Sequence, residues 1–137
     1  MSGYLLDTNV ISELLRKRPE PRVLARLRSV PAEDLATSAV CVMELRHGAA
    51  RHPGGDALWE RIRREVLSRV RVMSVDQPVG VRAGEILARL EARGRAIGLE
   101  DVLIASTALE RGLTVVTRNL RHFERVEGLR AESWWTS

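Results

Sequence analysis

The 137-residue chain contains a single cysteine, Cys41, and no lysine other than Lys17. One cysteine excludes an internal disulfide and a cysteine-rich zinc site. The three histidines are too scattered along the sequence to indicate a metal cluster. The segment "GRAIG" (94–98) lacks both the glycine spacing and the lysine of a phosphate-binding P-loop. These absences argue against disulfide-stapled, zinc-binding and P-loop proteins.

Long hydrophobic runs are also absent. No apolar stretch approaches the length needed to cross a bilayer. The first residues contain no basic segment followed by an apolar run, so we expect no signal peptide and a cytoplasmic location. With 45% hydrophobic and 29% charged residues, the chain has an ordinary globular balance. Its length predicts a single domain over residues 1–137 with a buried core.

The basic charge of the chain is carried almost entirely by arginine. The formal net charge is +4, and the planar guanidinium suits contacts to phosphates and bases. A genome that favours arginine codons explains the same bias equally well. Charge alone therefore does not identify a nucleic-acid partner.

The hydrophobic pattern predicts strands that alternate with helices. Strands are expected at 3–7, 33–38, 69–76 and 113–117, with an edge strand at 129–134. Helices are expected at 9–17, 21–29, 39–50, from an Asp56 N-cap to Val70, from an Asp76 N-cap to about Arg93, and at 99–111. In the third strand we expect Val70 and Val72 to point inward. This order predicts an α/β fold whose mostly parallel sheet of four to five strands is flanked by helices on both faces.

An acidic residue directly follows the first predicted strand. The stretch "GYLLDTNVISELL" (3–15) places Asp7 immediately after the apolar run Tyr4-Leu5-Leu6. Ligands of parallel α/β folds bind outside the carboxyl ends of the strands. Asp7 therefore either turns the chain or contributes to a site, and its possible companions decide between the two.

Glu44 lies on an unusual face of its predicted helix. The helical period of about 100° per residue places it in the same apolar arc as Cys41, Leu45 and Ala49. Burial of an unpaired carboxylate is costly, so we expect a cationic group to face it. Cys41, on the same face, is interpreted as a small core residue rather than a nucleophile.

The same test separates two adjacent acids in the helix at 99–111. Glu100 points away from the apolar face, as a surface acid should, whereas Asp101 shares that face with Ile104, Ala105 and Ala108. A carboxylate in the first helical turn is also favoured by the helix dipole, which is an equally good structural explanation for Asp101.

Three acids from separate elements, Asp7, Glu44 and Asp101, are thus predicted to point inward. Each alone is explained as a cap or as half of an arginine pair. Together they predict an oxygen-rich site that suits Mg²⁺ or Mn²⁺ rather than Zn²⁺. In a basic protein such a site is typical of an enzyme that cuts or transfers phosphodiesters.

At these positions the sequence resembles the PIN-domain ribonucleases, in particular the VapC toxins of toxin–antitoxin pairs. Three blocks carry the resemblance: "LLDTNVISEL", "TSAVCVMELRHG" and "IGLEDVLIASTALERGLTVVTRNLRHF". Their order and spacing cover essentially the whole chain, and any one of them alone would be a weak signal.

The resemblance implies a PIN domain that hydrolyses RNA phosphodiester bonds with Mg²⁺ or Mn²⁺. Asp7, Glu44 and Asp101 match the acidic metal-site positions of the family. Asn119 falls at a fourth catalytic position that is often Asp, and its neutral amide argues against a tightly held second ion. The resemblance also implies a homodimer, inhibited by a cognate VapB-type antitoxin whose C-terminal segment lies across the active-site groove.

Other residues are candidates for supporting roles. Arg46 and Arg118 are expected near the mouth of the site, where they would hold the RNA backbone unless they are simply solvated. The hydroxyls of Thr8, Ser38 and Thr117 lie near strand ends and would orient ligands or serve as caps. The apolar runs Ile11-Leu14-Leu15 and Trp59-Ile62-Val66 supply either docking surfaces or core. Trp134 and Trp135 would anchor the last strand or stack on bases.

Two competing interpretations stay open. Phosphotransfer proteins, such as receiver domains and haloacid-dehalogenase phosphatases, also place an Asp at a strand end. They need a downstream lysine, and Lys17 lies just after the first helix; the phosphatases also need an acid where this chain has Asn9. The second alternative is a catalytically weak PIN-like module that binds RNA or a partner without cutting, which the neutral Asn119 would suit.

Overall fold

A computed structural model describes residues 3–136 and contains a five-stranded sheet with the strand order β3-β2-β1-β4-β5. Every neighbouring pair of strands is parallel. The strands are β1 (Gly3–Leu6), β2 (Leu35–Ser38), β3 (Arg71–Met73), β4 (Leu113–Val116) and β5 (Ala131–Glu132). The predicted parallel α/β architecture is therefore confirmed.

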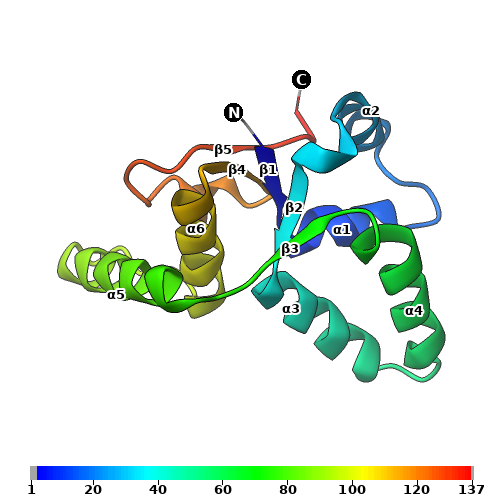
Figure 1. Ribbon diagram of the computed structural model, residues 1–137, viewed down its shortest axis with the longest axis horizontal. Helices are drawn as coiled ribbons and strands as arrows, with labels where there is room; N and C mark the ends of the chain where they lie inside the picture. Colours follow the sequence, from blue (N-terminus) through cyan, green and yellow to red (C-terminus); the bar gives the residue numbers. More distant parts are fainter. Residues whose placement is uncertain (1–2, 137) are drawn as a thin grey trace.

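Helices cover both faces of this sheet (Figure 1). They are α1 (Thr8–Leu14), α2 (Pro21–Ser29), α3 (Ala39–Ala50), α4 (Gly55–Ile62), α5 (Gln77–Ala92), α6 (Leu99–Arg111) and α7 (Leu120–Phe123). A 3-10 turn spans Ala32–Asp34, and a π-helix at Arg63–Leu67 follows α4 directly. Figure 1 places α5 and α6 on one side of the strands and α1, α2 and α4 on the other. No helix within residues 3–136 is both long and apolar enough to cross a membrane.

The core consists of two apolar clusters, one on each face of the sheet. Successive residues of a strand point to opposite faces. Leu5 accordingly belongs to the cluster beneath α5 and α6, whereas Leu6 belongs to the cluster beneath α1, α2 and α4. The strands β1, β2 and β4 are buried along their whole length except at Tyr4, which is half-buried. This explains why they appear in the sequence as short continuous apolar runs.

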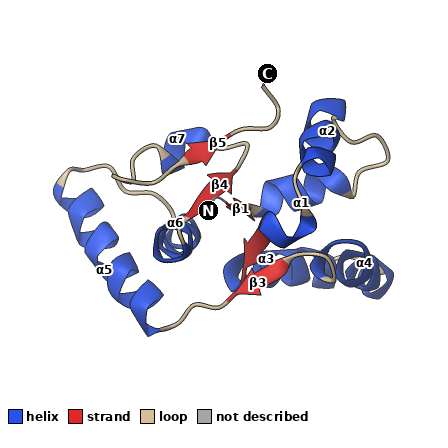
Figure 2. Cartoon of the chain, turned by 45° about the horizontal axis from the view of Figure 1, so that its top comes forward, coloured by secondary structure: helices blue, strands red, loops and turns tan. Residues whose placement is uncertain are grey.

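The strand order determines where a ligand site forms. The chain moves from β1 outward to β2 and β3, and then crosses back to the other side of β1 to form β4 and β5. The direction of winding therefore reverses between β1 and β4, whose carboxyl ends lie side by side (Figure 2). Such a switch point is the usual ligand position in parallel sheets.

Several predicted boundaries are confirmed because local side chains or glycine define them. The Asp76 carboxylate accepts a hydrogen bond from the Val79 backbone N–H and caps α5. The Ser38 hydroxyl accepts from the Val40 N–H and caps α3. Gly112 ends α6 in the left-handed region, at φ 66°, where glycine has no steric penalty.

Two expectations were wrong. Asp56 is not the N-cap of α4; Gly54 is, at φ 74°, and Asp56 lies in the first turn, where the helix dipole also favours a carboxylate. Val72 does not point inward but is 47% exposed, because β3 is an edge strand with one neighbour. For the two apolar runs, the structure favours the core over a docking surface: Ile11, Ile62 and Val66 are buried.

Candidate active site

Asp7 leaves the carboxyl end of β1 and is held from three directions. Its backbone N–H donates to the Val116 carbonyl of β4 at 2.9 Å. One carboxylate oxygen accepts from the Thr8 backbone N–H, and the other accepts from the Thr117 hydroxyl, each at 2.8 Å. The side-chain amide of Asn9 adds a longer contact of 3.3 Å. With 6% of the residue exposed, this carboxylate has a single orientation.

Glu44 reaches the same place from α3. Its Oε1 accepts a hydrogen bond of 2.6 Å from the Thr8 hydroxyl. Ligand atoms of Asp7, Glu44 and Cys41 all lie within 4.8 Å of one another. The cationic group expected to face Glu44 is absent: in the described part of the chain, neither Asp7 nor Glu44 forms a salt bridge. Two carboxylates therefore meet without a positive side chain to neutralise them.

Asp101 comes from the first turn of α6 and has a histidine as its partner. The His122 Nδ1 atom lies 2.7 Å from Asp101 Oδ2 and 3.0 Å from the Asn119 side-chain amide. One ring nitrogen cannot both donate to the carboxylate and accept from the amide. The tautomer of His122 decides which contact is a hydrogen bond: a proton on Nδ1 is donated to Asp101 Oδ2, whereas a proton on Nε2 leaves Nδ1 to accept from the Asn119 amide nitrogen.

All four residues expected at the site line one groove of about 540 Å³. Of the two arginines expected at its mouth, Arg118 lines it, and its guanidinium lies 5.4 Å from the Trp135 ring centroid. Arg46 does not line this groove and instead lies 5.4 Å from the Trp59 ring centroid. The complete lining is Asp7, Thr8, Asn9, Ser12, Glu13, Arg16, Glu44, Asp101, Arg118 and Asn119.

The environment of Asp7 raises its pKa from 3.8 to about 6. Burial is the largest cause, because it penalises the charged form. The hydrogen bonds from Thr117 and Thr8 lower the pKa in part, and the negative charges of Asp101 and Glu44 raise it again. A perturbed carboxyl in a groove, with two other acids close enough to act on it, is typical of a functional site.

The chemistry of the donor atoms favours a hard cation. Burial raises the pKa of the Cys41 thiol to about 11, so the thiol stays protonated and is a poor ligand. Its Sγ atom lies 3.7 Å from the Leu6 carbonyl, as expected for a core residue. The remaining donors are carboxylate, hydroxyl and amide oxygens, which suit Mg²⁺ or Mn²⁺. The residues present fit such an ion.

The sequence did not identify every residue at or beside the groove. His122, set aside there because the histidines are scattered, does not line the groove but contacts Asp101. Glu13 and its partner Arg16 line the groove and were not anticipated. Their spacing of three residues, at the end of α1 and just beyond it, is the only local signal of the pair. Of the three candidate hydroxyls, Thr8 and Thr117 contact the acids, and Ser38 is a cap.

Comparison with known proteins points to one family. The PIN domain family model matches residues 4–129. The chain is 40% identical over 124 residues to toxin FitB of Neisseria gonorrhoeae, covering 87% of this chain and 89% of that one. It is 33% identical to the tRNA(fMet)-specific endonuclease VapC of Salmonella typhimurium, covering 98% and 99% of the two chains.

A solved structure has the same fold. The crystal structure of FitAcB from Neisseria gonorrhoeae matches with a TM-score of 0.91 and 37% sequence identity, covering 98% of this chain and 99% of that one. The family match, the sequence identity and the fold lead to one conclusion: the chain belongs to the PIN-domain family.

Proposed function

We propose that this protein is a Mg²⁺- or Mn²⁺-dependent endoribonuclease that acts as the toxin of a toxin–antitoxin pair. One observation carries the proposal. Asp7, Glu44 and Asp101, from three separate elements, line one groove, and within residues 3–136 none of them is paired with an arginine or lysine. Acids placed for structure alone would be neutralised by such partners.

RNA as the substrate is supported by the relatives and by charge. One relative is a tRNA(fMet)-specific endonuclease, and another is a toxin. The chain itself carries a net charge of +4, and Arg16 and Arg118 line the groove together with the acids. A polyanion would therefore meet cations next to the acidic centre.

The side chains have distinct roles in the proposed hydrolysis. Asp7, Glu44 and Asp101 would hold the divalent ion, which supplies a Lewis acid for the scissile phosphate and a bound water of lowered pKa. Thr117 and the Thr8 backbone orient the Asp7 carboxylate, and the Thr8 hydroxyl orients Glu44. Orienting contacts of this kind commonly matter for metal sites.

The third acid, Asp101, is oriented by His122. The Nδ1 atom of His122 lies 2.7 Å from one carboxylate oxygen of Asp101, and Asn119 contacts the same ring nitrogen. Asn119 brings a polar but uncharged group to the groove, so three carboxylates provide all the negative charge among the four proposed site residues. This donor set suits one tightly held ion better than two.

A cognate antitoxin and a second copy of the chain are the proposed protein partners. The relative FitB was solved as FitAcB, which supports a partner bound to this fold. The exposed large apolar side chains that a dimer would cover are Met43, Val72, Val75, Val81 and Leu99. The antitoxin would inhibit by covering the acidic groove.

Substitution of the acids tests the proposed activity. Asp7→Asn and Asp101→Asn should each lower Mg²⁺-dependent cleavage of RNA by about a hundredfold or more, a loss comparable to that of one strong electrostatic contact in other hydrolases. Cleavage is measured on labelled total RNA with Mg²⁺, with Mn²⁺ and with EDTA. Glu100→Gln is the matched control, because Glu100 is the exposed neighbour of Asp101 and does not line the groove.

Folding of each variant is checked by circular dichroism, so that a loss of activity is not a loss of structure. Full activity in folded Asp7→Asn or Asp101→Asn, or activity that survives EDTA, would contradict the assignment. RNA that binds but stays intact during long incubation of the wild-type protein with Mn²⁺ would instead favour the non-cutting binding module.

A further inference from the structure

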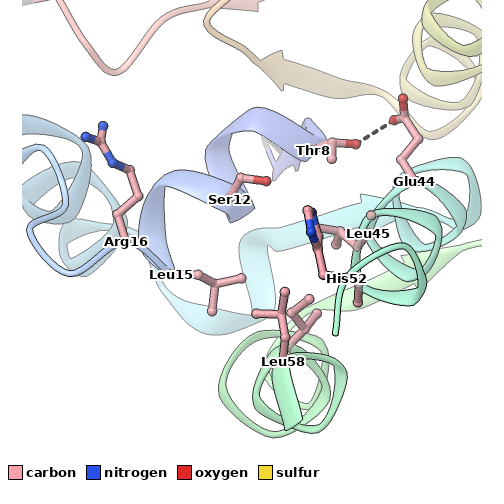
Figure 3. Close-up of a pocket in the computed structure, with 11 residues that line it drawn as sticks. Thr8, Ser12, Leu15, Arg16, Glu44, Leu45, His52 and Leu58 are labelled. Carbon is pink, nitrogen blue, oxygen red and sulfur yellow. Dashed lines mark hydrogen bonds between the residues drawn. The ribbon is translucent and has the colours of Figure 1, made fainter. Parts of the chain in front are cut away.

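A second cavity lies beside the acidic groove, and Glu44 is the one proposed metal ligand that lines it. It measures about 280 Å³ (Figure 3). Thr8, Ser12, Arg16 and Glu44 line both this cavity and the groove. The cavity and the groove are therefore neighbours, and the hydrogen bond between the Thr8 hydroxyl and Glu44 forms part of their common border.

Three helices form the walls of this cavity. Thr8 and Ser12 of α1 face Glu44 and Leu45 of α3 across it, and Leu58 of α4 closes the far side (Figure 3). The deeper lining is apolar and consists of Leu15, Leu45, Ala49, Leu58 and Ile62. The Ser12 hydroxyl and the His52 ring bring hydrogen-bonding atoms to the same cavity.

Arg16 places a positive charge where the cavity and the groove meet. Its Nη1 atom donates to both carboxylate oxygens of Glu13, at 3.2 and 3.3 Å. Glu13 is only 4% exposed and also accepts a 2.9 Å hydrogen bond from the Glu20 backbone N–H. The Arg16 side chain itself is 64% exposed. A buried acid thus fixes one end of a guanidinium whose other nitrogens remain accessible to solvent.

We propose that this cavity is a nucleotide subsite, which takes one unstacked base next to the scissile phosphate while Arg16 binds the adjoining phosphate. The proposal rests on the proposed ribonuclease function. Single-stranded RNA is recognised through splayed bases, whose faces need apolar contact and whose edges need hydrogen-bond partners. The cavity offers both, and the fixed guanidinium meets the backbone charge.

A protein side chain fits the same cavity less well. An aliphatic side chain from a partner would cover the leucines but would leave Ser12, His52 and Arg16 without the contacts they can make. The cavity also borders the acidic groove along Thr8, Ser12, Arg16 and Glu44, so a nucleotide in it would lie next to the acids. These features favour the substrate over a partner.

Gly48 allows the cavity to be blocked without disturbing the fold. It lines the cavity within α3, and a Cβ added there meets no heavy atom within 4 Å. Gly48→Leu therefore adds a helix-favouring side chain in open space. Gly84→Leu in α5 is the matched control, because Gly84 is helical and equally free of contacts but lies on the other side of the sheet.

Binding is measured in EDTA by fluorescence anisotropy, with a series of 5′-labelled ten-nucleotide RNAs. Each RNA of the series has one abasic nucleotide, at a different position along the strand. For the wild-type protein, one abasic position should weaken binding by about tenfold, within the range that a stacked base contributes. Gly48→Leu should bind intact RNA about tenfold more weakly and should no longer distinguish the abasic position. Gly84→Leu should behave like the wild type.

A second pair of variants tests the phosphate contact. Arg16→Met should reduce the slope of log affinity against log salt by about 0.7, the value for one phosphate contact on a single strand. Arg22→Met is its control, because Arg22 is bound to exposed Glu20 and lines neither cavity.

The proposal is overturned if no abasic position weakens binding, or if Gly48→Leu binds RNA as the wild type does. The second result would show that the cavity takes no part in RNA binding. These outcomes are separate from failure of the proposed function, which appears as intact RNA in the cleavage assay whatever the binding results.

Discussion

Asp7 has an environment that favours function over stability. Burial and two nearby acids raise its pKa to about 6, so its charged form is disfavoured in the folded protein. The unfolded chain has no such constraint and loses the proton near pH 3.8. The folded state therefore binds more protons than the unfolded state between these values, and stability falls as the pH rises through this window.

This difference predicts a stabilising substitution. Above pH 6 the ionised Asp7 should cost the metal-free protein about 3 kcal/mol, and Asp7→Asn should recover about 1–3 kcal/mol of it. The gain should be present at pH 8 and should vanish near pH 4, where the wild-type carboxyl is largely neutral. Urea unfolding in EDTA at both pH values measures it.

Asp56→Asn is the control for this prediction, because Asp56 is exposed and does not line the groove, so its substitution should not reproduce the gain at pH 8. A variant Asp7→Asn that is less stable than the wild type at pH 8 would show that the hydrogen bonds from Thr117 and Thr8 outweigh burial. The recovered stability should be accompanied by the loss of cleavage expected above.

At the scale of elements, the junction between α6 and β4 requires a left-handed backbone conformation. Gly112 is the sole residue between them and adopts φ 66°. The helix carries Asp101 at one end, and the strand leads to Thr117, so the turn fixes the relative position of two groove elements. A side chain at Gly112 is strained because the left-handed region places Cβ against the following carbonyl.

Gly112→Ala should therefore lower the free energy of unfolding by about 1–2 kcal/mol. Gly80→Ala within α5 is the control, since Gly80 is helical and a Cβ there meets no neighbour; it should raise stability by about 0.5–1 kcal/mol. Thermal unfolding followed by circular dichroism compares the two. Equal effects of both substitutions would refute the role of the positive φ.

Helices that begin at a capping side chain or end at a glycine were well predicted from sequence, and α4, which does neither, was not. The bounds of α6 are those expected, because an apolar face and a terminal glycine define them. The helix predicted from an Asp56 N-cap to Val70 was wrong in detail, because its N-cap is Gly54, two residues earlier, and it continues as a π-helix from Arg63. No side-chain pattern marks a change from i+4 to i+5 hydrogen bonding.

At the scale of the whole molecule, the exposed apolar side chains indicate where a second copy would bind. Val81 on α5 is 59% exposed and Met43 on α3 is 50% exposed. Helix α5 packs mainly on α6 and lies at one end of the molecule (Figure 2). Burial of such residues is a common basis of homodimers.

Light scattering at micromolar concentration should give the mass of two chains. Val81→Glu should shift the mass toward one chain by placing a charge in the interface. Ala25→Glu, at an exposed position of α2 on the opposite side of the sheet, should leave the dimer intact. A wild-type mass of one chain would contradict the proposed homodimer, and an unchanged mass in Val81→Glu would exclude this surface.

The sequence by itself determined the alternation of strands and helices, most helix ends and the three acids on unexpected faces. These properties depend on residues a few positions apart, so periodicity and capping reveal them. Only the tertiary structure decided which groups meet: Thr8 with Glu44, and Asp7 with Thr117, which are 36 and 110 residues apart. The tertiary structure also decided the position of Arg16 and of the cavity next to it. Such contacts follow from the order in which strands pair and helices pack, which is a property of the whole core rather than of any local segment.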